Sequence, residues 1–141
     1  MIPSVVRVYF CRPRALRKLA DLYSKSLGVS PTIVRPVEAG RMAMRGKVRE
    51  GLLVVEGFSS LVSSPRFGME DWVEVKKALK RLGAYSHVLV EAKELSWSPG
   101  DTGHVTVAGR RLPVASIDAE KSVEVARQIG ARETDVVVVL I

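Results

Sequence analysis

Two glutamates and one lysine stand where the chain is expected to leave neighbouring strands. Glu56 directly follows the apolar run 52–55, and Glu91 lies near the end of a predicted strand over 86–92, with Lys93 two residues further on. Open parallel sheets bind ligands at the carboxyl ends of their strands, so these three side chains could share one site. Two carboxylates can hold a divalent cation and a lysine can stabilise developing charge, which is the chemistry of phosphodiester cleavage.

The triplet Glu91-Ala92-Lys93, with an acid on a neighbouring strand, resembles the sites of metal-dependent nucleases. That resemblance implies that Glu56 and Glu91 hold the cation and that Lys93 polarises the attacking water. Val55-Glu56-Gly57 also resembles the acidic strand end of topoisomerase–primase domains, but the second motif of that family, two aspartates flanking one residue, is missing. The alternative is that both glutamates are solvated strand ends.

Other catalytic and cofactor-binding motifs are missing from the sequence. It contains no Gly-x-Gly-x-x-Gly after the first predicted strand, no Walker loop and no Gly-x-Ser-x-Gly. One cysteine, Cys11, and two histidines, His87 and His104, supply neither a zinc spacing nor a disulfide, and we expect Cys11 to be a packing residue. The sequence therefore predicts no bound cofactor, and no metal apart from the cation of the nuclease hypothesis.

Positive charge is concentrated near the N-terminus. The whole chain has a formal net charge of +7, and residues 1–50 contain eleven Lys or Arg against three Asp or Glu. The rest of the chain carries eleven bases and twelve acids, so the entire excess lies in the first fifty residues. Clustered cations attract a polyanion such as a nucleic acid. Solubility and ion pairing are the alternative explanation.

Two N-terminal segments are expected to present these cations. Apolar residues at helical spacing predict a helix from Pro13 to about Leu27, closed by Gly28, whose solvent face is cationic. From 40 to 50 basic residues stand at alternate or near-alternate positions, which predicts a strand with one cationic face, or a glycine-rich flexible loop. The predicted nucleic-acid-binding residues are Arg12, Arg14, Arg17, Lys18 and Lys25 in the first segment and Arg41, Arg45, Lys47 and Arg49 in the second.

These observations lead to one functional prediction and two alternatives. We predict a protein that binds the phosphate backbone of nucleic acid, RNA in preference to duplex DNA. No recognition helix, zinc finger or paired-aromatic sheet motif indicates base-specific recognition. Eight of the eleven N-terminal bases are arginine, which suits bidentate contacts to phosphate. The first alternative is the metal-dependent nuclease or phosphodiesterase that uses Glu56, Glu91 and Lys93, and the second is a non-catalytic subunit that docks an acidic protein.

The order of the predicted elements indicates a single α/β domain over residues 1–141. Three strand–helix–strand units span 5–37, 52–92 and 112–141, and right-handed crossovers would place their helices over a mostly parallel mixed sheet, in two or three layers. Residues 94–117 add a small antiparallel hairpin insertion. Helices are expected over 70–82 and 119–129, and a loop over 59–68. The apolar run 136–141 predicts a central strand in a parallel C-terminal unit.

Composition sets the class of protein. No apolar run approaches the roughly 20 residues of a membrane helix, and the N-terminus lacks a charged leader and a cleavage site, so we expect a cytoplasmic protein. The chain has no Asn and one Gln and is rich in charge, which is typical of heat-adapted proteins and indicates a thermophile, an archaeon. Trp72 is expected in the core, and Trp97, in a polar loop, is expected to be exposed for base stacking.

Overall fold

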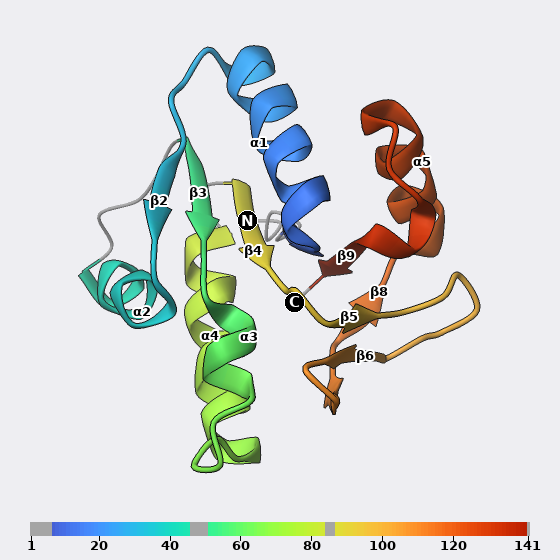
Figure 1. Ribbon diagram of the computed structural model, residues 1–141. Helices are drawn as coiled ribbons and strands as arrows, with labels where there is room; N and C mark the ends of the chain where they lie inside the picture. The colour runs from blue at the N-terminus through green and yellow to red at the C-terminus, as the bar shows by residue number, and fades with distance from the viewer. Residues whose placement is uncertain (1–6, 46–50, 84–86, 141) are drawn as a thin grey trace, which may run out of the picture.

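The centre of the molecule is a six-stranded sheet in the order β2-β3-β4-β1-β9-β8 (Figure 1). The computed structural model describes residues 7–45, 51–83 and 87–140. The strands are β1 (Arg7–Cys11), β2 (Thr32–Val34), β3 (Leu52–Val55), β4 (His87–Glu91), β8 (Ser116–Ile117) and β9 (Val136–Leu140). The first four of these strands are parallel, and β9 is antiparallel to both of its neighbours, β1 and β8. The predicted mixed, mostly parallel α/β sheet is confirmed.

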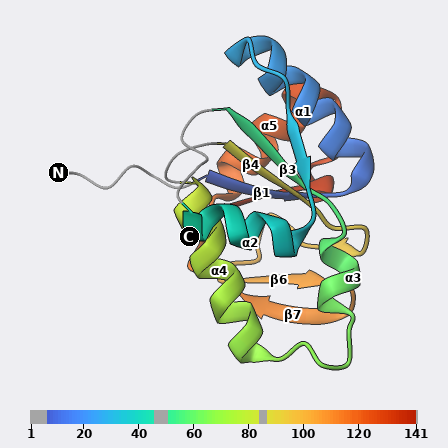
Figure 2. The same ribbon diagram turned by 90° about the vertical axis from the view of Figure 1, so that its left-hand side faces the viewer.

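Helices cover both faces of this sheet and make three layers. One face carries α1 (Pro13–Leu27) and α5 (Ala119–Ile129), and the other carries α2 (Pro36–Arg45), α3 (Phe58–Val62) and α4 (Met69–Gly83) (Figure 2). Successive side chains of a strand point to opposite faces. Val8 and Phe10 of β1 therefore enter the core beneath α2, α3 and α4, whereas Tyr9 and Cys11 enter the core beneath α1 and α5.

Local signals explain where the three longest helices begin and end. Pro13 opens α1, where a missing backbone N–H is tolerated, and Gly28 ends it in the left-handed conformation with φ 67°. Asp118 caps α5 by accepting a hydrogen bond from the backbone N–H of Lys121 at 2.9 Å. α4 has acids in its first turn and bases in its last, which matches the helix dipole at both ends. The predicted bounds of these helices are confirmed to within about one residue.

Three short strands form a second, antiparallel sheet in the order β5-β6-β7. They are β5 (Leu95–Ser96), β6 (His104–Val107) and β7 (Arg110–Pro113), so the predicted hairpin is present with one further strand. Trp72 links α4 to this second sheet, because its indole N–H donates to the carbonyl of Pro113 in β7 at 2.7 Å and its side chain is fully buried. The core position predicted for Trp72 is confirmed.

The exposure expected of Trp97 is wrong. Its side chain is buried, and its indole N–H donates to the carbonyl of Asp101 at 3.3 Å. The turn that follows β5 is closed by Asp101, whose carboxylate accepts from the backbone N–H of Ser98 at 3.0 Å. The polar residues around Trp97 belong to this turn, and the ring itself packs in the hydrophobic core.

The C-terminal unit is not parallel, which corrects the prediction for 112–141. β8 and β9 are antiparallel, with Ile117 opposite Val139. β8 has only two residues, and α5 connects it to a last strand that runs in the opposite direction. The interior position predicted for the apolar run is confirmed, since β9 lies between β1 and β8 and Val136–Val139 are buried.

The segment that follows β2 is a helix and not the strand or loop that was predicted. α2 begins at Pro36 and continues to Arg45, so the expected strand over 31–37 shrinks to Thr32–Val34, at the edge of the sheet. Ala39 and Ala43, four residues apart, bury one face of α2. Basic residues four apart suit a helix as well as a strand, which is why the alternation was ambiguous. Lys47 and Arg49 lie outside the described residues.

The predicted loop over 59–68 contains a helix, α3, in its first half. Phe58 and Val62 anchor it, both nearly or fully buried. Between them, the hydroxyl of Ser59 accepts from the backbone N–H of Lys93 at 2.8 Å. Ser63, directly after α3, donates its hydroxyl to the carbonyl of Ser60 at 3.2 Å. In the described part of the chain, none of the helices has the length and apolar character required to cross a membrane.

Candidate functional site

A polar cavity of about 330 Å³ lies at the carboxyl ends of the parallel strands. In Figure 1 the arrows of β3 and β4 point the same way, β3 leads into α3, and α1 begins near the level of the two arrowheads. Open α/β sheets bind ligands at this edge, because the chain leaves every parallel strand there. The residues that line the cavity are Pro13, Leu16, Arg17, Arg35, Glu56, Gly57, Ser60, Glu91 and Lys93. We call it the carboxyl-edge pocket.

Backbone hydrogen bonds extend the sheet into this pocket and hold its loops. The N–H of Glu56 donates to the carbonyl of Val34 at 2.9 Å, and the N–H of Ala92 donates to the carbonyl of Cys11 at 2.9 Å. The N–H of Lys93 donates to the buried hydroxyl of Ser59 at 2.8 Å, which ties the end of β4 to α3. The acidic and basic side chains therefore start from ordered backbone.

Glu91 is the most unusual residue of the pocket. It is paired with Cys11 across β1 and β4, and only 8% of its surface is exposed. Among the residues that the structure describes, none donates a hydrogen bond to its Oε1. A buried polar group without a partner is destabilising, and Glu91 lines the pocket, so its carboxylate is suited to accept a hydrogen bond from a ligand bound there. The hypothesis that Glu91 is a solvated strand end is therefore wrong, whereas Glu56 is half-buried.

Arg35 enters the pocket from β2 and crosses to the end of β3. A Cβ atom placed on Gly57 would lie 2.5 Å from Nη1 of Arg35, so the guanidinium rests directly on the backbone of Gly57. Gly57 also has φ 80°, which a residue with a side chain rarely adopts. Glycine is thus required here both for the turn and for the approach of Arg35.

Three cationic side chains line the pocket together with the two carboxylates and form no ion pairs among the described residues. Arg17, Arg35 and Lys93 are exposed, and among the described residues none of them has a carboxylate oxygen within 4.0 Å. Arg14 and Lys18, which neighbour Arg17 on the exposed face of α1, also lack such a partner in residues 7–45, 51–83 and 87–140. The cationic face of α1 therefore continues into the pocket.

The structure places the predicted basic residues in different settings. Arg12 is half-buried and holds the fold together, since its guanidinium bonds Asp135 at 3.2 Å and the carbonyl of Leu95 at 2.8 Å. Lys25 pairs with Asp21 at 3.0 Å, one turn earlier on α1. Arg41 and Arg45 are exposed on α2, across the sheet from α1.

The carboxyl-edge pocket brings together Glu56, Glu91 and Lys93, the three residues singled out for phosphodiester chemistry, and adds Arg17 from the basic helix. Arg35 was missed because the predicted strand continued through it to Val37. The signal was nevertheless present, since Arg35 follows β2 directly, as Glu56 follows β3.

Other reactive side chains play no part in the pocket. Burial, and secondarily the negative charge of Glu91, raises the pKa of the Cys11 thiol, so this fully buried sulfur stays protonated. His87 opens β4 at the far end of the sheet, and His104 belongs to the second sheet. Within the part of the chain that the structure describes, no three His, Cys, Asp or Glu side chains gather as metal ligands. A cation here would therefore need phosphate oxygens or water to complete its shell.

No protein-family model matches the chain, and no curated protein or solved structure matches it significantly.

Proposed function

We propose that this protein binds single-stranded RNA through its phosphate backbone, with the carboxyl-edge pocket as the anchoring site. One observation supports the proposal above the others: Arg17, Arg35 and Lys93, which have no ion-pair partner among the described residues, line the same pocket as the buried Glu91. Cations of this kind attract phosphate, and arginine binds it in a bidentate manner.

Glu91 supports RNA over DNA. A buried carboxylate oxygen accepts hydrogen bonds and would repel a phosphate, so the group it suits is a donor such as a ribose hydroxyl. The 2′-hydroxyl is the group that distinguishes RNA from DNA. In the proposed complex the arginines and the lysine hold phosphates while Glu91 accepts from the ribose between them.

The neighbouring face of α1 extends the contact. Arg14 and Lys18 are exposed beside Arg17, so a strand that enters the pocket can continue along the helix. Arg41 and Arg45 lie on the other face of the sheet. They remain candidates for a separate contact with a longer RNA, and Arg12 and Lys25 are occupied by the partners described above.

The test is a charge reversal on α1. Arg14→Glu with Lys18→Glu should weaken single-stranded RNA binding across sequences and leave the fold intact, because exposed substitutions usually change stability by less than about 0.5 kcal/mol. A single-stranded DNA of the same sequence should bind the unmodified protein more weakly, since it cannot donate to Glu91. Fluorescence anisotropy measures both.

The matched control reverses two exposed cations on α4, Lys80→Glu and Arg81→Glu, which lie on the opposite face of the sheet from α1 and have no ion pair among the described residues. Unchanged RNA affinity in the α1 variant would remove the helix from the site. No binding of RNA or DNA even at about 50 mM salt would leave an acidic protein as the partner of the basic face.

A metal-dependent phosphodiesterase is the second candidate, because Glu56, Glu91 and Lys93 share one pocket. Two carboxylates and a substrate phosphate can complete a Mg²⁺ site, and Lys93 would stabilise charge on the attacked phosphate. Under our primary proposal, RNA and DNA incubated with Mg²⁺ or Mn²⁺ show no cleavage above background. Cleavage that requires the cation and disappears in Glu91→Gln would establish the enzyme instead.

A further inference from the structure

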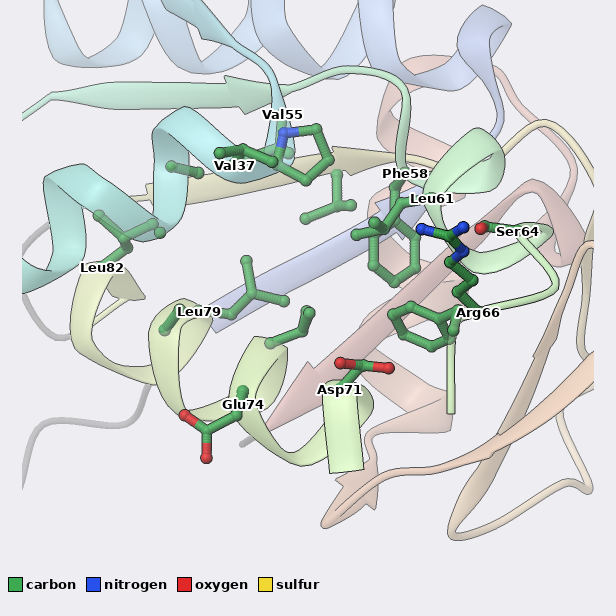
Figure 3. Close-up of a pocket in the computed structure, with 17 residues that line it drawn as sticks. Val37, Val55, Phe58, Leu61, Ser64, Arg66, Asp71, Glu74, Leu79 and Leu82 are labelled. Atoms are coloured by element: carbon green, nitrogen blue, oxygen red, sulfur yellow. The ribbon is translucent and has the colours of Figure 1, made fainter. Parts of the chain in front are cut away.

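A second cavity, of about 420 Å³, opens between α2 and α4 on the opposite face of the sheet (Figure 3). Its floor is formed by Val55 and Val90 and its walls by apolar side chains such as Phe58 and Leu79. Cavities that bind small molecules have this size and this mostly apolar lining, with a few polar groups at one place. None of the residues proposed for RNA binding lines this cavity. Val55 and Val90 of its floor are the sequence neighbours of Glu56 and Glu91.

Gly40 of α2 lines this cavity. It lies inside the ten-residue helix α2, where glycine is the least favourable residue after proline. A glycine in a helix is commonly explained by close packing, yet a Cβ atom at this position would meet nothing within 4 Å. Gly40 borders the cavity, so the space that a side chain would fill is left empty at a cost to helix stability.

One end of the cavity carries the guanidinium of Arg66, and the lining also holds two acids. Figure 3 shows the guanidinium of Arg66 beside Ser64 at the end of the cavity opposite Leu82. Both acids have contacts of their own: Asp71 accepts from the backbone N–H of Gly68 at 2.8 Å, and Glu74 pairs with Lys77 at 3.5 Å. Arg66 has no ion pair among the described residues.

We propose that this cavity binds a small amphipathic anion, an apolar chain that carries one carboxylate. In this proposal the apolar tail of the ligand lies between α2 and α4 against Val55 and Val90, and its carboxylate binds Arg66 and the hydroxyl of Ser64. The two helices pack against each other. The space between them therefore suits a slender chain rather than a partner helix, whose diameter is about 10 Å.

The test uses decanoate as the probe, measured by isothermal titration calorimetry on the full chain. Gly40→Leu should abolish decanoate binding because leucine fills the cavity, whereas Gly40→Ala, the matched control, gains the same helix propensity and should still bind. Arg66→Gln should weaken binding about tenfold or more, as expected for the loss of a charged hydrogen bond. Decyltrimethylammonium, which has the same chain and a positive head, should bind more weakly than decanoate to the unmodified protein.

Three outcomes would overturn the proposal. They are no decanoate binding by the unmodified protein at millimolar concentration, equal binding by Gly40→Leu and Gly40→Ala, and equal affinity of Arg66→Gln and the unmodified protein. The Arg66 variant keeps the test valid if Gly40→Leu fails to fold, because Arg66 is exposed.

Discussion

At the scale of single residues, Gly57 brings together Glu56 and Arg35 of the carboxyl-edge pocket. It follows Glu56 in the chain and contacts the guanidinium of Arg35, the residue directly after β2. The sequence indicated Glu56, Glu91 and Lys93 because acids and bases after apolar runs are visible without a structure. It could not indicate the unpartnered state of Glu91 or the contact between Arg35 and Gly57, because both depend on side chains brought together by the sheet.

Gly57→Ala should therefore affect both stability and RNA binding. The positive φ of 80° costs a residue with a side chain about 1–2 kcal/mol, and the added Cβ must displace Arg35 from the pocket. Chemical denaturation measures the loss of stability, and anisotropy measures the loss of RNA affinity.

Gly103→Ala is the matched control, since Gly103 has φ 74° and a Cβ there would meet nothing within 4 Å. This variant should lose similar stability and keep its RNA affinity. If Gly57→Ala bound RNA as tightly as Gly103→Ala, Arg35 would have no place in the binding site.

At the scale of secondary-structure elements, local sequence signals predict an element best where tertiary packing does not override them. α1, α4 and α5 were predicted because each has an apolar stripe and signals at its ends, such as Gly28 and the Asp118 cap. The helix α2 and the antiparallel direction of β9 were not predicted. The burial of Ala39 and Ala43, and the two-residue length of β8, are consequences of tertiary packing that short patterns do not record.

Val138 provides a prediction at this scale. It is 1% exposed in β9, opposite Tyr9 of β1, in the core beneath α1 and α5. Val138→Asp should unfold the domain or nearly so, because an unpaired buried charge costs several kcal/mol. Circular dichroism with thermal melting tests this.

Ile33→Asp serves as the comparison, since Ile33 is 59% exposed on the edge strand β2. This variant should remain folded, with a small loss of stability. A melting temperature of Val138→Asp close to that of Ile33→Asp would show that β9 does not form the interior of the sheet.

For the whole molecule, the sheet divides the positive charge of the N-terminal segment between two faces. Arg14, Arg17 and Lys18 lie on α1 and lead to the carboxyl-edge pocket, whereas Arg41 and Arg45 lie on α2 across the sheet. The sequence predicted the excess of charge but not this division, since the division depends on which face each helix covers. The second face also holds the apolar cavity, so the fold separates a polar site from an apolar one.

The salt dependence of single-stranded RNA binding tests the central claim most directly. The logarithm of the association constant should fall linearly with the logarithm of salt concentration, with a slope of about −0.7 for each phosphate contact. The variant with Arg14→Glu and Lys18→Glu loses two proposed contacts, so its slope should be flatter by about 1.4. Equal slopes for the variant and the unmodified protein, or no RNA binding at about 50 mM salt, would contradict the proposal that α1 and its pocket form the RNA-binding site.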